Sequence, residues 1–295
     1  MKIRSLFLLT IVSPLHAGEL IPSQIATSAK WQVHADLDAM RESDTGKSLF
    51  RTIESEHGAK LRAAKRMFSI HPLTDLRGIT LYGDGKPDHA VALIDGKFDR
   101  AHLEDIVKAA DDYESTDYDG VTVHIWTDKG APQYAAFTSD QLLVFSHQRS
   151  MLNLALDTLK SPRTAEPDAF LGESGESPLL SASARLSEMN LPGDEARIVG
   201  MAKVLRLAAN EHDERFTLRS KIDATTAANA GILRRILDGV VAFAQVSDPK
   251  LEGLDLRSAF TTTAETLSGT LSLPTPEWIS LMEKAAAEKA NQKPE

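Results

Sequence analysis

Histidine is the side chain best suited to acid–base or metal chemistry near neutral pH, and the sequence contains nine. Helical zinc sites use His-x-x-x-His or His-Glu-x-x-His spacing, and neither pattern occurs here. The histidines beyond the N-terminal segment are His34, His57, His71, His89, His102, His124, His147 and His212. A metal site would need residues far apart in the chain, so we predict no metal and no cofactor.

The segment Ser43-Asp44-Thr45-Gly46-Lys47-Ser48 has the Gly-Lys-Ser ending of a phosphate-binding loop. That loop also needs a glycine five positions before Gly46, where the backbone approaches the phosphates, and this chain has Arg41. The segment therefore predicts the start of a helix that is N-capped by Ser43, Asp44 or Thr45.

An acidic segment from 111 to 120 could in principle gather carboxylates around calcium. A calcium loop places oxygen ligands at alternate positions and ends in a distal Glu, whereas Tyr113 and Tyr118 interrupt this one. We interpret the segment as a solvated connection between a helix and a strand.

Two serine-containing segments approach nucleophile motifs without matching them. Gly172-Glu173-Ser174-Gly175 lacks the Gly-x-Ser-x-Gly spacing, and Pro249 prevents the helical turn that Ser247 and Lys250 would need. Both are predicted to be loops. Carboxylate pairs for hydrolysis remain open because the chain has 42 Asp and Glu residues, so the catalytic residues, if there are any, stay unknown.

Composition narrows the function classes further. The chain has 295 residues, 33 Lys and Arg against 42 Asp and Glu, and a formal charge of −9, which argues against a nucleic-acid partner. It has no cysteine, which excludes disulfides, thiolate catalysis and cysteine metal sites.

The N-terminus predicts export. Lys2 and Arg4 precede an apolar stretch from 5 to 15, and small Ala17 precedes Gly18, a pattern typical of a secretory signal peptide. We expect residues 1–17 to be removed by cleavage after Ala17, which also removes two cations and leaves a more acidic chain. No later stretch is apolar enough to cross a bilayer, so we predict no integral membrane segment after cleavage.

Hydrophobic periodicity predicts strands and helices in repeated order along the first half, 18–160. A strand is expected at 31–37, a hairpin at 76–83 and 88–97, and a helix from Asp99. A second hairpin at 121–127 and 133–146 precedes a helix from Arg149. The stretch 161–178 contains three prolines and two glycines and reads as a linker or long loop.

The second half, 179–295, repeats this order. It has expected strands at 197–208 and 214–223 followed by a helix from Thr225, then strands at 256–263 and 265–273. A last helix begins at Thr275-Pro276-Glu277. We therefore predict an α+β fold of two similar halves, each an antiparallel sheet of two ββα units with helices packed on one face.

Several segments of the first half are similar to a loose group of exported bacterial proteins of unknown function. They are Asp95-Gly96-Lys97-Phe98-Asp99 before an amphipathic helix, the run from Tyr118 to Trp126, and the strands 76–83 and 142–147. The resemblance spans about residues 31 to 160. It implies bacterial export and a repeated α+β architecture, and it brings no catalytic residues.

These observations favour a non-catalytic, periplasmic or extracellular protein that binds a protein partner or an envelope component. An alternative is a carrier of an apolar or amphipathic ligand, because a groove would use the same residue types as a core, including Trp126 and Trp278. A second alternative is a hydrolase whose site is assembled from distant residues. The oligomeric state is left open. A flat apolar patch would favour a partner, a large dry pocket a carrier, and converging carboxylates or histidines an enzyme.

Overall fold

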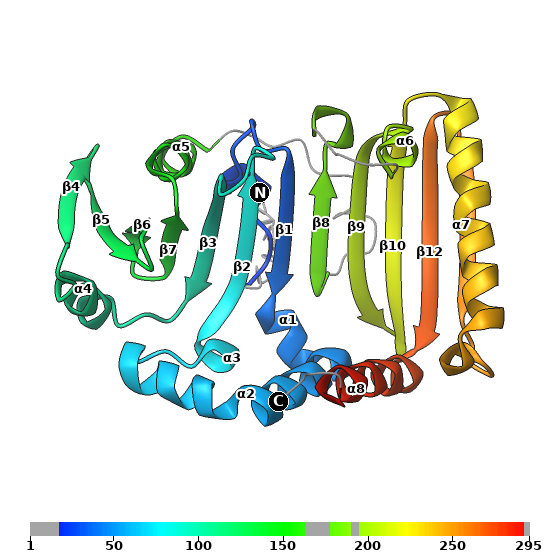
Figure 1. Ribbon diagram of the computed structural model, residues 1–295, viewed down its shortest axis with the longest axis horizontal. Helices are drawn as coiled ribbons and strands as arrows, with labels where there is room; N and C mark the ends of the chain where they lie inside the picture. Colours follow the sequence, from blue (N-terminus) through cyan, green and yellow to red (C-terminus); the bar gives the residue numbers. More distant parts are fainter. Residues whose placement is uncertain (1–17, 163–177, 190–194, 292–295) are drawn as a thin grey trace, which may run out of the picture.

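The computed structural model describes residues 18–162, 178–189 and 195–291, and its strands join into one antiparallel sheet. The order of the strands is β11-β12-β10-β9-β8-β1-β2-β3-β7-β6-β5-β4 (Figure 1). The two predicted halves meet where β1 pairs with β8, so they share this single sheet. The predicted α+β class is confirmed.

The strand bounds follow the predicted hairpins in most places, but β8 was not predicted, and the strand expected from 197 begins only at Ala202, after a short helix. The strands are β1 (Trp31–Asp36), β2 (Leu76–Gly83), β3 (Ala90–Gly96), β4 (Glu114–Tyr118), β5 (Val121–Asp128), β6 (Ala131–Ser139), β7 (Leu142–Ser146), β8 (Leu180–Ala184), β9 (Ala202–His212), β10 (Arg215–Ala224), β11 (Arg257–Thr263) and β12 (Thr266–Pro274).

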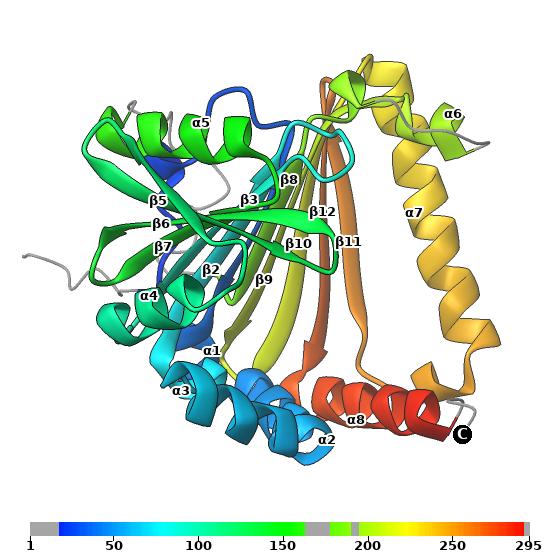
Figure 2. The same cartoon turned by 60° about the vertical axis from the view of Figure 1, so that its left-hand side comes forward.

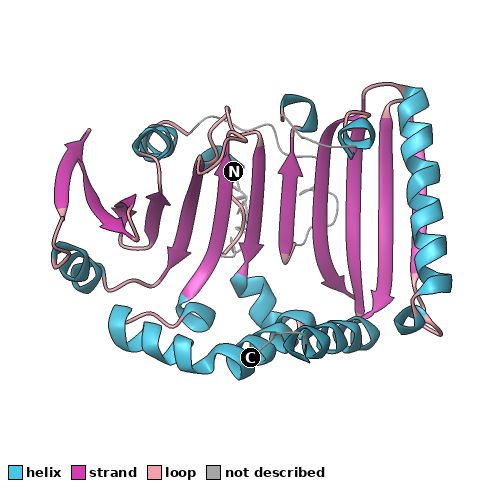
Figure 3. Cartoon of the chain, viewed as in Figure 1, coloured by secondary structure: helices cyan, strands magenta, loops and turns pink. Residues whose placement is uncertain are grey.

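The helices surround the single layer of strands (Figure 3). The α-helices are α1 (Leu37–Glu42), α2 (Asp44–Phe68), α3 (Pro72–Asp75), α4 (Arg100–Lys108), α5 (Arg149–Lys160), α6 (Glu195–Val199), α7 (Ala227–Ser247) and α8 (Thr275–Asn291), and the 3₁₀ helices are η1 (Pro22–Gln24), η2 (Leu186–Glu188) and η3 (Pro249–Leu251). No helix in these ranges is long and apolar enough to cross a membrane.

Side-chain caps start the helices where the sequence predicts them. Ser43 begins α2 by accepting a hydrogen bond from the Gly46 backbone N–H at 3.0 Å, which confirms that the Gly-Lys-Ser segment is a helix start. Asp99 caps α4 through the backbone N–H of His102, and Thr226, one residue after the predicted position, caps α7.

Two predictions for the strands of the first half were wrong. The acidic segment is no mere connection, because residues Glu114–Tyr118 form the edge strand β4, joined to β5 by a tight Asp119-Gly120 turn with positive φ at both residues. The range 133–146 is two strands, β6 and β7, rather than one. The alternation of side chains continues through this hairpin, so periodicity alone hid the turn.

The buried core forms two clusters, on opposite faces of the sheet. Strand register places Tyr82, Val91 and Val144 on one face, where they pack against α5; we call this the α5 face. Leu267 and Ile222 lie on the other face, which we call the α7 face, and pack with Leu233 of α7. Figure 2 shows the sheet running between α5 and α7.

The placement of helices on the first half of the sheet also differs from prediction. Phe137 lies on the α7 face, where its ring meets Phe98 just before α4, with ring centroids 5.6 Å apart. Helices α4 and α5 therefore lie on opposite faces of the same strands, where one covered face was expected. The cause is that β5 and β6 carry apolar side chains on both faces, such as Val123 on one and Phe137 on the other.

Candidate functional site

The middle of the α7 face is apolar across four neighbouring strands. In register, Leu81 of β2 lies opposite Val33 of β1, which lies opposite Ala182 of β8, which lies opposite Leu207 of β9. A second row, one pleat along, runs through Ile79, Ala35 and Leu180. We call these seven residues the central apolar patch.

The central apolar patch lies outside both buried clusters of the described chain. Leu81 is 38% exposed and Leu180 is 41% exposed, and the other five members are half-buried. Isolated exposed leucines are common on protein surfaces, but a contiguous apolar area on a sheet face is a feature of binding surfaces.

The residues opposite this patch are polar or buried. On the α5 face of the same strands, Ser183 pairs with Arg206, and His34 and Thr80 are enclosed. Farther along, this face of β9 and β10 carries Arg206 and Lys221, as expected of a face in contact with water. On β1, β8 and β9 the α5 face is therefore polar or buried while the α7 face is apolar, and β2 is apolar on both faces.

The described helices meet the α7 face only at its margins. Helix α7 packs over β10, β11 and β12, and α4 lies over β5. At the end of the strands, α2 and α8 run side by side across the sheet (Figures 1 and 2). The patch thus lies between covered regions of the same face.

Specific polar contacts fix α2 and α8 at that end. The Glu211 carboxylate on β9 accepts hydrogen bonds from the backbone N–H groups of Asp44 and Thr45, both at 2.8 Å, at the positive end of the α2 dipole. Trp278 of α8 stacks on Phe216 of β10, with ring centroids 4.2 Å apart and planes 4° from parallel. These contacts hold both helices at the margin of the patch.

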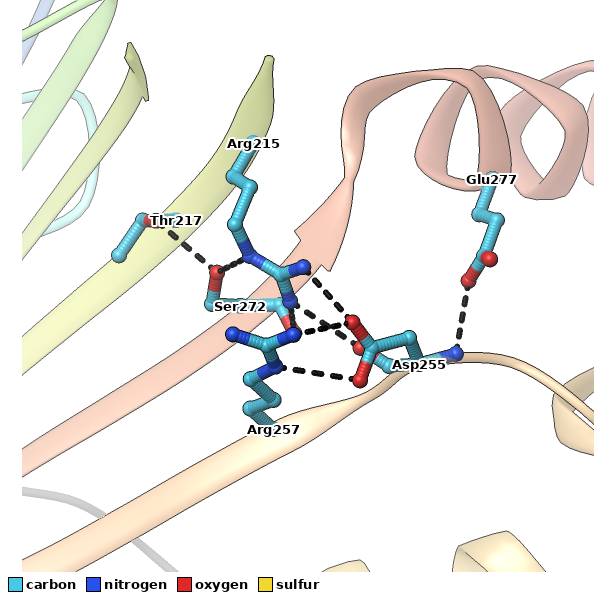
Figure 4. Close-up of polar contacts among 6 residues, drawn as sticks. All are labelled: Arg215, Thr217, Asp255, Arg257, Ser272 and Glu277. Atoms are coloured by element: carbon cyan, nitrogen blue, oxygen red, sulfur yellow. Dashed lines mark hydrogen bonds and ion pairs between the residues drawn. The ribbon is translucent and has the colours of Figure 1, made fainter. Parts of the chain in front are cut away.

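An arginine–aspartate network holds the chain between α7 and α8 to the sheet (Figure 4). Asp255 receives hydrogen bonds from Arg257 and Arg215, and these two guanidinium groups hold the pKa of its carboxyl below the ordinary value. Arg215 also donates to Ser272, and the Asp255 backbone N–H donates to Glu277 of α8. The network ties β10, β12 and the start of α8 together.

Two open cavities lie elsewhere, beside the C-terminal end of α5. Their volumes are about 480 Å³ and about 460 Å³, and both are lined by Asp119, Asp157 and Lys160. Lys160 pairs with Asp119, and Tyr118 donates its hydroxyl hydrogen bond to Asp157, which raises the pKa of that tyrosine. The charged side chains of these walls are thus paired within the chain, and apolar side chains line much of the remainder.

The predicted histidines do not converge. In the described ranges, no group of three or more His, Asp or Glu side chains is arranged to hold a metal ion. His124 is buried next to Tyr113 and Glu104, and burial lowers its pKa, while His34 is enclosed in the middle of the sheet. Ser247 ends α7 and Lys250 lies in η3, and Gly172-Glu173-Ser174-Gly175 lies outside the described residues.

The expected strands include β1, β2 and most of β9, but neither β8 nor the patch that these four strands form together was predicted. The available signal was that β2 carries Leu81 and Tyr82 on consecutive positions, so both of its faces are apolar. A strand of this kind is apolar on two sides, and one helix can cover only one of them.

Comparison with known proteins gives a fold likeness only. No protein-family model matches the chain, and no curated protein matches its sequence. Crystal form III of the Treponema protein TP0453 is similar in structure, with a TM-score of 0.53 and 10% identity over 89% of this chain and 97% of that one. Crystal form IV gives a TM-score of 0.52 and 10% identity over 90% and 97%. At such identity the likeness shows a shared architecture.

Proposed function

We propose that this chain is an exported, non-catalytic bacterial protein that binds a protein partner of the cell envelope through the central apolar patch. The observation that carries this proposal is the register of β2, β1, β8 and β9. It assembles two adjacent apolar rows on a face that the described helices cover only at its margins.

The shape of the patch favours a protein partner over a small ligand. Side chains on a sheet face form a broad, shallow surface, which suits another protein surface of the same kind. A carrier would be expected to enclose an apolar ligand in a dry cavity. The two cavities beside α5 are open rather than enclosed, and the charged residues Asp119, Asp157 and Lys160 line both of them.

The export half of the proposal rests on the N-terminal segment. Residues 1–17 carry the charge, apolar run and small terminal residue of a signal peptide, and they lie outside the described residues. The folded elements begin after this segment, at η1 and β1, so its removal leaves every described element intact.

The test is photo-crosslinking in intact cells, with a photoreactive residue at position 180 or, as a matched control, at position 183. Both positions lie on β8, but Leu180 faces the central apolar patch and Ser183 lies on the opposite face. We expect a discrete protein adduct from position 180 that is absent from position 183. Leu81→Glu, which places a charge on the same patch two strands away, should abolish the adduct.

Three other results would contradict the proposal. A lipid adduct at position 180 would favour the carrier, and equal adducts from positions 180 and 183 would remove the patch as the binding surface. An adduct that persists at full yield in the Leu81→Glu chain would do the same. Circular dichroism of Leu81→Glu checks that the variant is folded.

A further inference from the structure

Gly18, the first described residue, is buried in a close-fitting site against the paired ends of β1 and β2, where Asp36 lies opposite Gly78. A Cβ atom at this position would lie 2.4 Å from Asp36 Oδ1 and 2.5 Å from the Arg77 carbonyl oxygen, distances that no side chain tolerates. The Gly18 carbonyl oxygen in turn lies 2.7 Å from where a Cβ of Gly78 would be. Only glycine fits at both positions.

A buried histidine holds the carbonyl group of Gly18. His34 Nε2 lies 2.9 Å from the Gly18 oxygen and must donate, because a carbonyl oxygen can only accept. His34 Nδ1 then accepts a hydrogen bond from the Thr80 hydroxyl at 2.9 Å. Gly18 is thereby fixed in position although it lies at the very start of the folded chain.

Asp36 is the unexplained group in this site. Its side chain is 0% exposed; Oδ1 accepts a hydrogen bond from the Ala39 backbone N–H, whereas Oδ2 has no hydrogen-bond partner in the described chain. Burial raises the pKa of Asp36, and the neighbouring acids Asp38 and Glu19 raise it further. Arg41, five residues along the chain, donates to Asp38, and Arg77, whose backbone carbonyl borders the site, donates to Asp95. The site therefore holds a buried carboxyl group without a cation.

We propose that this site binds the α-ammonium group that signal-peptide cleavage creates on Gly18. Hydrolysis of the Ala17–Gly18 bond by the peptidase of the export pathway consumes one water, leaves a carboxylate on Ala17 and an amine on Gly18, and the amine takes up a proton. The proposal rests on the export part of the proposed function. It assigns Asp36 as the counter-ion of the mature N-terminus.

The geometry supports this pairing. The Gly18 nitrogen and the position of a Cβ are both bonded to the same Cα and so lie about 2.5 Å apart, which places the nitrogen within about 5 Å of the Asp36 carboxylate. An α-ammonium group has three N–H donors, and Oδ2 has lone pairs to accept from them. The pair forms only in the cleaved chain, because an uncleaved Gly18 nitrogen is a neutral amide.

Cleavage should therefore reverse the effect of one substitution. In the mature chain, Asp36→Asn removes the anion and leaves the ammonium group buried without a counter-ion, so we expect Tm to fall by roughly 5–10 °C. In the uncleaved precursor, the same change removes an unpaired buried acid, so Tm should stay or rise. Asparagine is a good N-cap and can keep the hydrogen bond to Ala39.

The experiment compares precursor and exported protein, each as wild type and as Asp36→Asn. The control is Asp99→Asn, the same chemical change at the N-cap of α4, and it should shift Tm equally in precursor and exported protein. The mass of the exported protein establishes the cleavage position first. A chain that stays uncleaved in the cytoplasm would overturn the export proposal and this one together, whereas cleavage at another bond would overturn this one alone.

Other outcomes concern the N-terminal site alone. If cleavage occurs after Ala17 but Asp36→Asn lowers Tm equally in precursor and exported chain, the pairing is wrong while export stands. A second readout is the acylation of the α-amine by acetic anhydride at pH 7. It should be ~10-fold slower in the mature wild type than in a free Gly-Glu-Leu peptide, because pairing raises the pKa of the amine by about one unit or more. An equal rate would also overturn the proposal.

Discussion

Helices α5 and α7 each cover part of the same sheet, but to different depths. In α5, four of twelve residues are buried, and Leu152 and Ala155 are completely so. In α7, which has 21 residues, only Ala230 and Leu233 are buried, and both lie in its first two turns. Toward its other end, Val240, Phe243 and Val246 are 57%, 73% and 89% exposed.

This difference separates two kinds of covering. The α5 region is a closed core in which both the helix and the strands beneath it lose contact with water, and such regions open only when the whole domain unfolds. The α7 region is closed at one end of the helix and open at the other. The central apolar patch lies between the two regions, on the face that α7 covers only in part.

Truncating one leucine in each helix should reveal this contrast most strongly. We expect Leu152→Ala in α5 to lower the free energy of unfolding by about 4 kcal/mol, because the closed core cannot collapse around the cavity. Leu233→Ala in α7 should cost about 2 kcal/mol, since neighbours at the more open interface can move into the space. Urea denaturation monitored by circular dichroism measures both values. Equal losses of unfolding free energy would mean that the α5 and α7 interfaces are equally closed.

Acid should destabilise the chain through a buried histidine in the first half of the sheet. Burial lowers the pKa of His34 to about 4, so between pH 6.5 and pH 4 the unfolded chain binds a proton that the native chain does not. Stability is therefore complete above pH 6.5 and falls as the pH drops toward 4, by up to about 3 kcal/mol. In the described part of the second half, the histidine is the largely exposed His212.

The measurement is urea denaturation at pH 7 and pH 4.5 for wild type, His34→Gln and His212→Gln. The loss between the two pH values should shrink in His34→Gln, whose amide does not titrate, and persist in His212→Gln. A wild-type chain equally stable at both pH values would show that His34 is protonated without cost, and so is not enclosed as described.

Sequence patterns predicted the local structure better than its assembly. Capping residues are local signals, and Ser43 and Asp99 start helices as expected. The pairing of β1 with β8 joins residues about 150 positions apart, and nothing in either strand encodes that partner. The predicted halves therefore became one sheet, with helices on both of its faces.

The candidate sites were hidden for a related reason. Leu81 belongs to an expected strand, whereas Leu180 belongs to the short strand β8, which was not predicted. Their common face depends on the register of three strands. Asp36 lies within an expected strand, and Gly18 lies beside the expected cleavage site. The site that brings them together nevertheless requires β1 and β2 to be paired. Single-sequence reasoning identifies residue types and not such juxtapositions.

The smallest expected effect concerns the open end of α7. Phe243→Gln replaces an exposed ring with a good helix former, so the free energy of unfolding should change by no more than about 0.5 kcal/mol. Backbone amides of residues 240–247 should exchange hydrogen sooner than those of 230–237, because the first group lies on the poorly anchored turns. Hydrogen exchange followed by mass spectrometry, together with urea denaturation, tests both points. A loss of 2 kcal/mol or more, or equal protection along α7, would mean that the stripe of Val240, Phe243 and Val246 packs against another surface in solution, and the contrast with α5 would disappear.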